Sequence, residues 1–315
     1  MLNHIKAVML GHAIGDALGV PVEFRSRDWL KRKPVTDMTG FGTHNVPAGC
    51  WSDDTSMAIC ALESLSKGIV DYDDVMKNFV DWLYQWKFTA TGVVFDVGGT
   101  CYEAISRYNY GHFSANCCGL NDEMYNGNGS LMRIHPFVLY AYYNGITNDA
   151  FDSVISNASS LTHAHQCSID GCIIYAYVLK ELLDNPSMQS VYTGITKAKD
   201  KIKTANTYYH RLCHNNIAEF DEAHIKSSGY IVDSLEAAVW CVLTTQSYKD
   251  CVLKAVNLGN DTDTIAAIAG SLAGALYGID SIPEHWISTL KRKDFIVCMC
   301  ENAYNIWRQN ELQGA

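Results

Sequence analysis

Apolar residues recur every three or four positions through most of this chain, which is the spacing of an amphipathic α-helix. In the segment 55–65, for example, Met57, Cys60 and Leu65 fall on one face. Alternating, strand-like runs are scarce, and only the short stretch 229–232 has an extended character. The pattern therefore predicts an all-α fold, with helices at 55–65, 74–86, 98–107, 131–143, 149–162, 168–183, 189–203, 233–243, 249–257, 263–276 and 294–308.

Two helical stretches, one near the start of the chain and one near residue 270, carry a glycine at every fourth position. These glycines are Gly11, Gly15, Gly19, Gly270, Gly274 and Gly278. Glycine costs about 1 kcal/mol in a helix interior relative to alanine. We expect another backbone to pack very closely against each row, which would also fix the polar residues nearby.

The composition describes a globular chain with a sizeable core. It has 315 residues, of which 48% are hydrophobic and 18% are charged, and it contains no low-complexity tract or long linker. We expect a single compact domain over 1–315. The net charge of −10 disfavours general binding to nucleic acid, because phosphate backbones repel an acidic surface.

Twelve cysteines are present, but no C-x-x-C pair or zinc-type Cys/His spacing occurs. Reduced thiols in a cytoplasmic protein are therefore expected. The first ten residues lack the pattern of a signal peptide. The longest apolar run, Ile265–Tyr277, is shorter than the ~20 residues that span a bilayer, so it predicts a buried helix and no membrane association. No heptad or apolar surface stripe is evident, which favours a monomer.

Two acidic clusters stand out near opposite ends of the chain, one from Ser52 to Thr55 and one from Asp261 to Thr264. Either cluster alone fits a helix N-terminus, where a hydroxyl or carboxylate caps the first turn. Capping does not require so many acids and hydroxyls, and these oxygen ligands suit Mg²⁺ or Mn²⁺. If the fold brings the two clusters together, they can hold a two-metal site.

Smaller polar groups lie between the clusters. The glycines of 127–130 precede a helix, where backbone N–H groups favour an anion and Arg133 adds charge, although an ordinary turn would look the same. His163 and His165 do not share a helical face, so capping or ligand contact competes with a metal role. Asp96 fits an N-cap, and Glu23 is expected on a loop.

Several of these segments together resemble the ADP-ribosylglycohydrolase family, which includes the dinitrogenase-reductase-activating glycohydrolase and the ADP-ribosyl-acceptor hydrolases. The matching segments occur in the family's order. They are GHAIGDALGVPVEF at 11–24, WSDDTSMA at 51–58, FDVGGT at 95–100, GNGSLMRIHPF at 127–137, LTHAH at 161–165 and GNDTDTIAAIAGSLAGALYG at 259–278. The resemblance implies a compact all-α fold with a cleft that holds two divalent cations, Mg²⁺ or Mn²⁺.

Site residues follow from the resemblance by position. The implied metal ligands are Ser52, Asp53, Asp54, Asp261, Asp263 and Thr264. Family members more often have threonine at the position of Ser52, but serine keeps the hydroxyl.

The resemblance also implies catalytic and ligand-binding residues. The general acid or base would come from Asp53, Asp54 or Asp96, and Glu23 corresponds to a loop glutamate that in some members reaches the metals or the substrate. The loop of Gly127, Asn128, Gly129, Ser130 and Met132 would cradle the diphosphate, and His163 would contact the ADP-ribose.

We therefore expect a metal-dependent enzyme that removes ADP-ribose from a modified protein side chain, arginine foremost, by cleaving the bond at ribose C1″. Serine, a nucleic-acid base or a small ester are alternative acceptors. A non-catalytic ADP-ribose-binding or transferase-inhibiting member is a second alternative, although such members usually lose metal-ligand acids. An all-α His-Asp phosphohydrolase is disfavoured, because the chain has no His-Asp pair.

Overall fold

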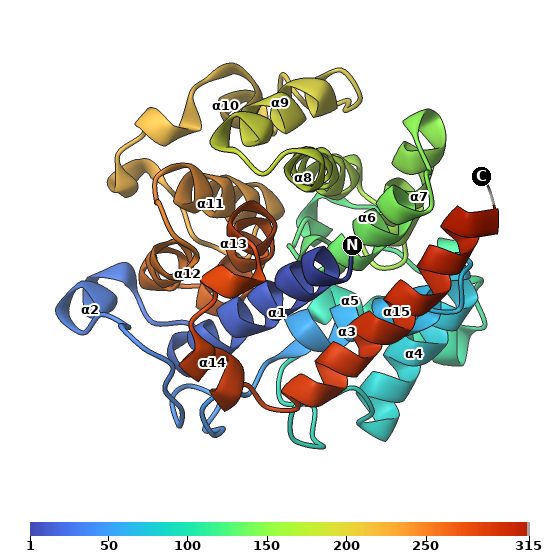
Figure 1. Cartoon of the computed structure of the whole chain (residues 1–315), viewed down its shortest axis with the longest axis horizontal. Coiled ribbons are helices and arrows are strands. Elements are labelled where there is room, and N and C mark those ends of the chain that lie inside the picture. Colours follow the sequence, from blue (N-terminus) through green and yellow to red (C-terminus); the bar gives the residue numbers. More distant parts are fainter. Residues whose placement is uncertain (314–315) are drawn as a thin grey trace.

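The structure is a computed structural model that describes residues 1–313, and these residues form a bundle of helices (Figure 1). The α-helices are α1 (Leu2–Gly19), α2 (Arg27–Arg32), α3 (Asp53–Leu65), α4 (Tyr72–Gln85), α5 (Gly99–Gly111), α6 (His135–Tyr143), α7 (Asn148–Ser160), α8 (Gln166–Asp184), α9 (Met188–Lys199), α10 (His210–His214), α11 (Ile231–Leu243), α12 (Tyr248–Asn257), α13 (Thr262–Tyr277), α14 (Glu284–Thr289) and α15 (Lys293–Gln313). No strand forms within 1–313, where only isolated bridges occur. The predicted all-α fold is confirmed.

The two glycine-rich helices, α1 and α13, lie side by side in the middle of the molecule (Figure 1). A Cβ added to Gly15 would lie 2.5 Å from the carbonyl carbon of Ala266, and one added to Gly270 would overlap the carbonyl oxygen of Gly11. The expected close approach of two backbones is therefore confirmed. Gly278 is the exception, because it has open space around it and a φ of 79° and ends α13.

One segment, Leu2–Val22, is long and apolar enough to cross a membrane by length and composition. From the sequence we identified Ile265–Tyr277 as the longest apolar run and did not single out Leu2–Val22, because single polar residues interrupt the latter segment. In the structure, 94% of the most apolar 18-residue stretch of this segment is buried. Since α1 packs along α13, this segment is explained as a core helix.

Several local expectations need correction. The predicted helix 131–143 is divided into a 3-10 turn, Leu131–Arg133, and α6, which has Pro136 in its first turn. The predicted extended stretch 229–232 makes only one bridge, at Tyr230, and Ile231 already begins α11. Asp96 is not an N-cap, because Gly98 occupies that position before α5.

Candidate active site and metal centre

The first acidic cluster begins α3. Ser52 is its N-cap, and the Ser52 Oγ accepts a hydrogen bond of 3.3 Å from the backbone N–H of Asp54. Asp16, from the middle of α1, supports this turn by accepting from the backbone N–H groups of Ser52, at 2.9 Å, and Thr55, at 3.1 Å. The capping interpretation therefore holds for Ser52, and it leaves the neighbouring carboxylates free for another role.

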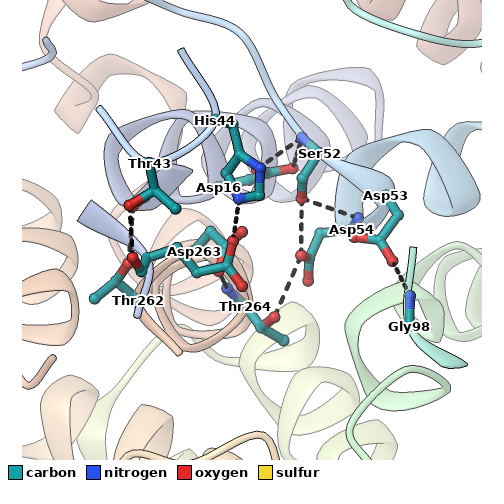
Figure 2. A network of polar contacts seen from close by, with 12 residues as sticks. Asp16, Thr43, His44, Ser52, Asp53, Asp54, Gly98, Thr262, Asp263 and Thr264 are labelled. Atoms are coloured by element: carbon teal, nitrogen blue, oxygen red, sulfur yellow. Dashed lines mark hydrogen bonds and ion pairs between the residues drawn. The ribbon is translucent and has the colours of Figure 1, made fainter. Parts of the chain in front are cut away.

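The second cluster begins α13 and meets the first. Thr264 Oγ1 donates to Asp54 Oδ2 at 3.3 Å, so the starts of α3 and α13 face one another (Figure 2). Oxygens of Asp16, Asp54 and Asp263 lie within 4.8 Å of one another, and so do those of Glu23, Asp261 and Asp263. The two groups share Asp263, which is the arrangement expected of two adjacent cation positions.

The electrostatics of these carboxylates are unfavourable without a cation. Burial, followed by repulsion from Asp16 and Asp53, raises the pKa of Asp54 well above its ordinary value. Burial raises the pKa of Asp16 to about 6. Burial raises the pKa of Glu23 to about 7, although its hydrogen bond with His44 opposes the shift. Carboxylates gathered in this way require protons or bound cations.

The donor set fits hard divalent cations. Asp54 Oδ1 is buried and has no hydrogen-bond partner among the described residues, so this oxygen is available to a cation or a proton. Carboxylate oxygens and the hydroxyls of Ser52 and Thr264 are ligands of the kind that Mg²⁺ and Mn²⁺ prefer. Asp53 is oriented differently, because its Oδ2 accepts from the backbone N–H of Gly98 at 3.3 Å (Figure 2). Its part in holding a cation stays a prediction.

A cavity of about 340 Å³ opens beside the carboxylates. It is lined by residues from widely separated segments, namely Glu23, Phe24, Asp53, Asp96, Val97, Gly98, Gly99, Thr100, Cys101, Gly127, Asn128, Gly129, Met132, His163, Gly229, Asp261 and Thr264. The structure thus brings most of the predicted site residues to one cavity. Ser52, Asp54 and Asp263 are buried and do not line it.

The predicted phosphate loop joins the cavity to the acidic cluster. The side-chain amide of Asn128 donates to Asp261 Oδ2 at 2.7 Å and to Ser234 Oγ at 2.9 Å. Ser130 differs from the other predicted ligand-contacting residues, because its hydroxyl is buried and accepts from Ser159 Oγ at 3.0 Å instead of lining the cavity.

His163 lies under this loop in a fixed orientation. Its Nδ1 is 2.8 Å from Thr162 Oγ1, which accepts from Arg133 at 2.7 Å. Burial, reinforced by the charge of Arg133, lowers the pKa of His163 to about 3, so the imidazole is neutral. Arg133 is fully buried and does not line the cavity, so it orients His163 through Thr162 and is not placed to contact a ligand there. His165 caps α8.

If the loop binds ADP-ribose, as the resemblance implies, Gly129→Ala should weaken that binding by roughly tenfold, because a shifted His163 would no longer fit the ligand. The added Cβ would lie 2.7 Å from Cys101 Sγ and 2.9 Å from His163 Cε1, so the loop or the imidazole must move. Calorimetric titration with ADP-ribose in the presence of Mg²⁺ measures the effect. In Gly127→Ala the Cβ would meet its nearest neighbour at 3.6 Å, so its unliganded Tm should match the wild type. Equal ADP-ribose affinity in Gly129→Ala and wild type would contradict the proposed cradle.

Sequence reasoning assigned no role to two residues of this site. Asp16 lies within the quoted segment 11–24, and its signal is an acid in an otherwise apolar, glycine-rich helix. His44 lies in a loop outside every quoted motif and contacts Glu23. No periodicity or spacing marks His44, because only the folded loop brings it to Glu23.

An all-helical protein with a buried carboxylate cluster beside a glycine-lined cavity has a site that could hold divalent cations next to a bound ligand. The chain belongs to the ADP-ribosylglycohydrolase family, whose model matches residues 1–313. It is therefore a glycohydrolase.

Individual relatives agree with this assignment. The ADP-ribosylarginine hydrolase Tri1 of Serratia proteamaculans is 32% identical over 96% of this chain and 79% of its own length. The ADP-ribosyl-dinitrogen-reductase glycohydrolase of Rhodospirillum rubrum is 32% identical over 90% of this chain and 89% of its own. A solved structure, described as an ADP-ribosylglycohydrolase-related protein complex, superposes with a TM-score of 0.81 at 29% identity and covers 97% of this chain and 98% of its own.

Proposed function

We propose that this enzyme releases ADP-ribose from modified arginine side chains of proteins and that it depends on two divalent cations, Mg²⁺ or Mn²⁺. One observation carries the proposal. Two groups of carboxylates share Asp263 behind a cavity that is also lined by the Gly127–Gly129 loop and by Asp96. Two relatives of this chain are named ADP-ribosylarginine hydrolases, which supports arginine as the acceptor.

We divide the carboxylates into two sets. Asp54 and Asp263 are buried, belong to the carboxylate groups and do not line the cavity, so we assign them to holding the cations. Ser52, Asp261 and Thr264 from the same two clusters complete this set, although Asp261 and Thr264 also reach the cavity. When bound, the cations would polarise a ribose hydroxyl or a water and offset the negative charge of the cluster. Glu23, Asp53 and Asp96 line the cavity, and we place the proton transfer among these three.

In the reaction, the oxygen of a water molecule forms a bond with C1″ and the water gives one proton to a cavity carboxylate. The bond between C1″ and the guanidine nitrogen breaks, and the nitrogen keeps the electron pair and receives a proton. Glu23, Asp53 and Asp96 line the cavity, so each is placed where a carboxylate could take this proton and return it. The remaining carboxylates favour the positive charge that develops on the ribose.

The alternative acceptors and the non-catalytic alternative lead to different outcomes of one experiment. ADP-ribose release is measured from arginine-modified and serine-modified proteins, with Mg²⁺, with Mn²⁺ and with EDTA. We expect release from the arginine conjugate, its loss in EDTA, and recovery with Mg²⁺ or Mn²⁺ in preference to Zn²⁺.

Other results would change the assignment. Metal-dependent release from the serine conjugate alone would replace the acceptor. No release from either conjugate by a folded protein that binds ADP-ribose would favour another acceptor or the non-catalytic alternative, and release that persists in EDTA would contradict the metal centre.

A further inference from the structure

His44 lies beside two carboxylates that line the cavity, those of Glu23 and Asp96. Its Nε2 pairs with Glu23 Oε2, and ligating atoms of Glu23, His44 and Asp96 lie within 4.8 Å of one another. The His44 side chain is only 12% exposed, and its ring centre is 5.2 Å from that of Phe95 and 6.2 Å from that of Phe24. The imidazole is therefore held in place by aromatic neighbours as well as by its charged partner.

The loop that carries His44 is built onto the turn that carries Glu23. The backbone N–H of Thr43 donates to Pro21 O at 2.9 Å, and Thr43 Oγ1 donates to Glu23 O at 2.7 Å. A Cβ on Gly42 would overlap the carbonyl of Pro21, so the two backbones touch. These contacts fix the backbone of Glu23 relative to His44.

The following residue fixes the same turn from the other side. Phe24 has a φ of 64°, which is rare for a bulky residue, and its N–H donates to Asn260 O at 2.7 Å, next to Asp261. With its backbone fixed on both sides, Glu23 retains freedom only in its side chain.

That side chain has two sets of neighbours. The Glu23 carboxylate lies within 4.8 Å of ligating atoms of Asp261 and Asp263 in one group, and within 4.8 Å of those of His44 and Asp96 in the other. The described contacts of its carboxylate include one hydrogen-bond partner, the imidazole of His44. Removing the imidazole leaves the Glu23 side chain free to take other rotamers.

We propose that His44 is a positioning residue for the reaction: its imidazole holds the Glu23 carboxylate at the cavity edge beside Asp96, where it meets the scissile bond. The inference rests on the proposed function, because the position of Glu23 matters only if Glu23 moves a proton in that cavity. In this role His44 acts through Glu23, with which it pairs, and it is not among the residues that line the cavity.

Kinetics of His44 variants test this role. His44→Ala should lower kcat for the arginine conjugate by about tenfold or more, with little change in the Kd for ADP-ribose. His44→Gln keeps an N–H donor and should recover most of that loss. In the Glu23→Gln background, His44→Ala should cost less than about twofold further, because the two residues act as one unit. His285→Ala is the matched control, because it removes a histidine–carboxylate pair, 3.0 Å from Asp37, on the exposed surface.

Crystal structures of the variants provide a readout that does not depend on turnover. The Glu23 carboxylate should keep its place in His44→Gln and leave it in His44→Ala. The inference would be overturned if the Glu23 carboxylate kept its place in His44→Ala. It would also be overturned if His44→Ala lowered kcat by the same factor in the wild-type and in the Glu23→Gln background. If the wild type releases no ADP-ribose from either conjugate, the proposed function fails, and the crystal structures still decide whether His44 holds Glu23.

Discussion

Asp54→Asn is expected to abolish ADP-ribose release, by about a thousandfold or more, and at the same time to raise the Tm of the protein in EDTA. The two effects have one cause. Asp54 is buried near Asp16, Asp263 and Thr264, and its Oδ1 has no hydrogen-bond partner among the described residues. A negative charge there would stabilise a bound cation and would destabilise the folded protein when no cation is bound.

The asparagine side chain has nearly the same shape, so the packing around it should survive. Its remaining oxygen can still accept from the hydroxyls of Ser52 and Thr264, as Asp54 Oδ2 does at 3.0 and 3.3 Å. Its amide group, however, offers donors where a cation needs an acceptor. Added Mg²⁺ or Mn²⁺ should therefore raise the Tm of the wild type and leave that of Asp54→Asn unchanged.

Thermal melts in EDTA and in Mg²⁺, together with the release assay, measure both effects. We expect the EDTA melt of the variant to lie roughly 3 °C or more above that of the wild type. Asp280→Asn removes the same charge from an exposed turn and should alter neither turnover nor the response to metal. Wild-type turnover in Asp54→Asn, or an undiminished Mg²⁺ shift, would refute the assignment of Asp54 to the cations.

Helices were predictable where they are long and have one buried face. The expected segments 74–86 and 249–257 correspond to α4 and α12, whose boundaries differ by no more than two residues. The short helices α2, α10 and α14 were missed, because one or two turns show no apolar period. They form because neighbouring segments hold them, and a single-sequence pattern does not contain that information.

The site was predictable where its residues are consecutive. The clusters that begin α3 and α13 were visible in the sequence as consecutive acids and hydroxyls, and the structure brings them together. Their juxtaposition did not follow from either cluster alone, since it depends on α1, which packs along α13 and whose Asp16 accepts from the backbone N–H groups of Ser52 and Thr55. His44 was not predicted for a related reason. A single histidine in an irregular loop has no sequence signal, and its role depends on the carboxylates of Glu23 and Asp96 that the fold places near it.

The packing of α1 against α13 supplies the second large effect. Gly15→Ala is expected to destabilise the protein by about 2–3 kcal/mol, despite the better helix propensity of alanine. The new Cβ would lie 2.5 Å from the carbonyl carbon of Ala266 and 2.9 Å from the N of Ala267, and both are backbone atoms of α13 that cannot rotate away. The helices must separate, and the Tm should fall by roughly 5 °C or more.

Separation of these helices should also disturb the acidic site. Asp16 follows Gly15 on α1, and Asp263 lies one turn before Ala267 on α13, so a shift of one helix alters the distances among the carboxylates. The variant should therefore bind Mg²⁺ or Mn²⁺ more weakly than the wild type in calorimetric titration, even at temperatures where it stays folded. Gly145→Asn is the matched control, because Gly145 has open space around it and a φ of 66° that asparagine tolerates. A Gly15→Ala protein with wild-type Tm and metal affinity would show that α1 and α13 can accommodate the added Cβ. The close contact of these two helices would then not be what holds the acidic site together.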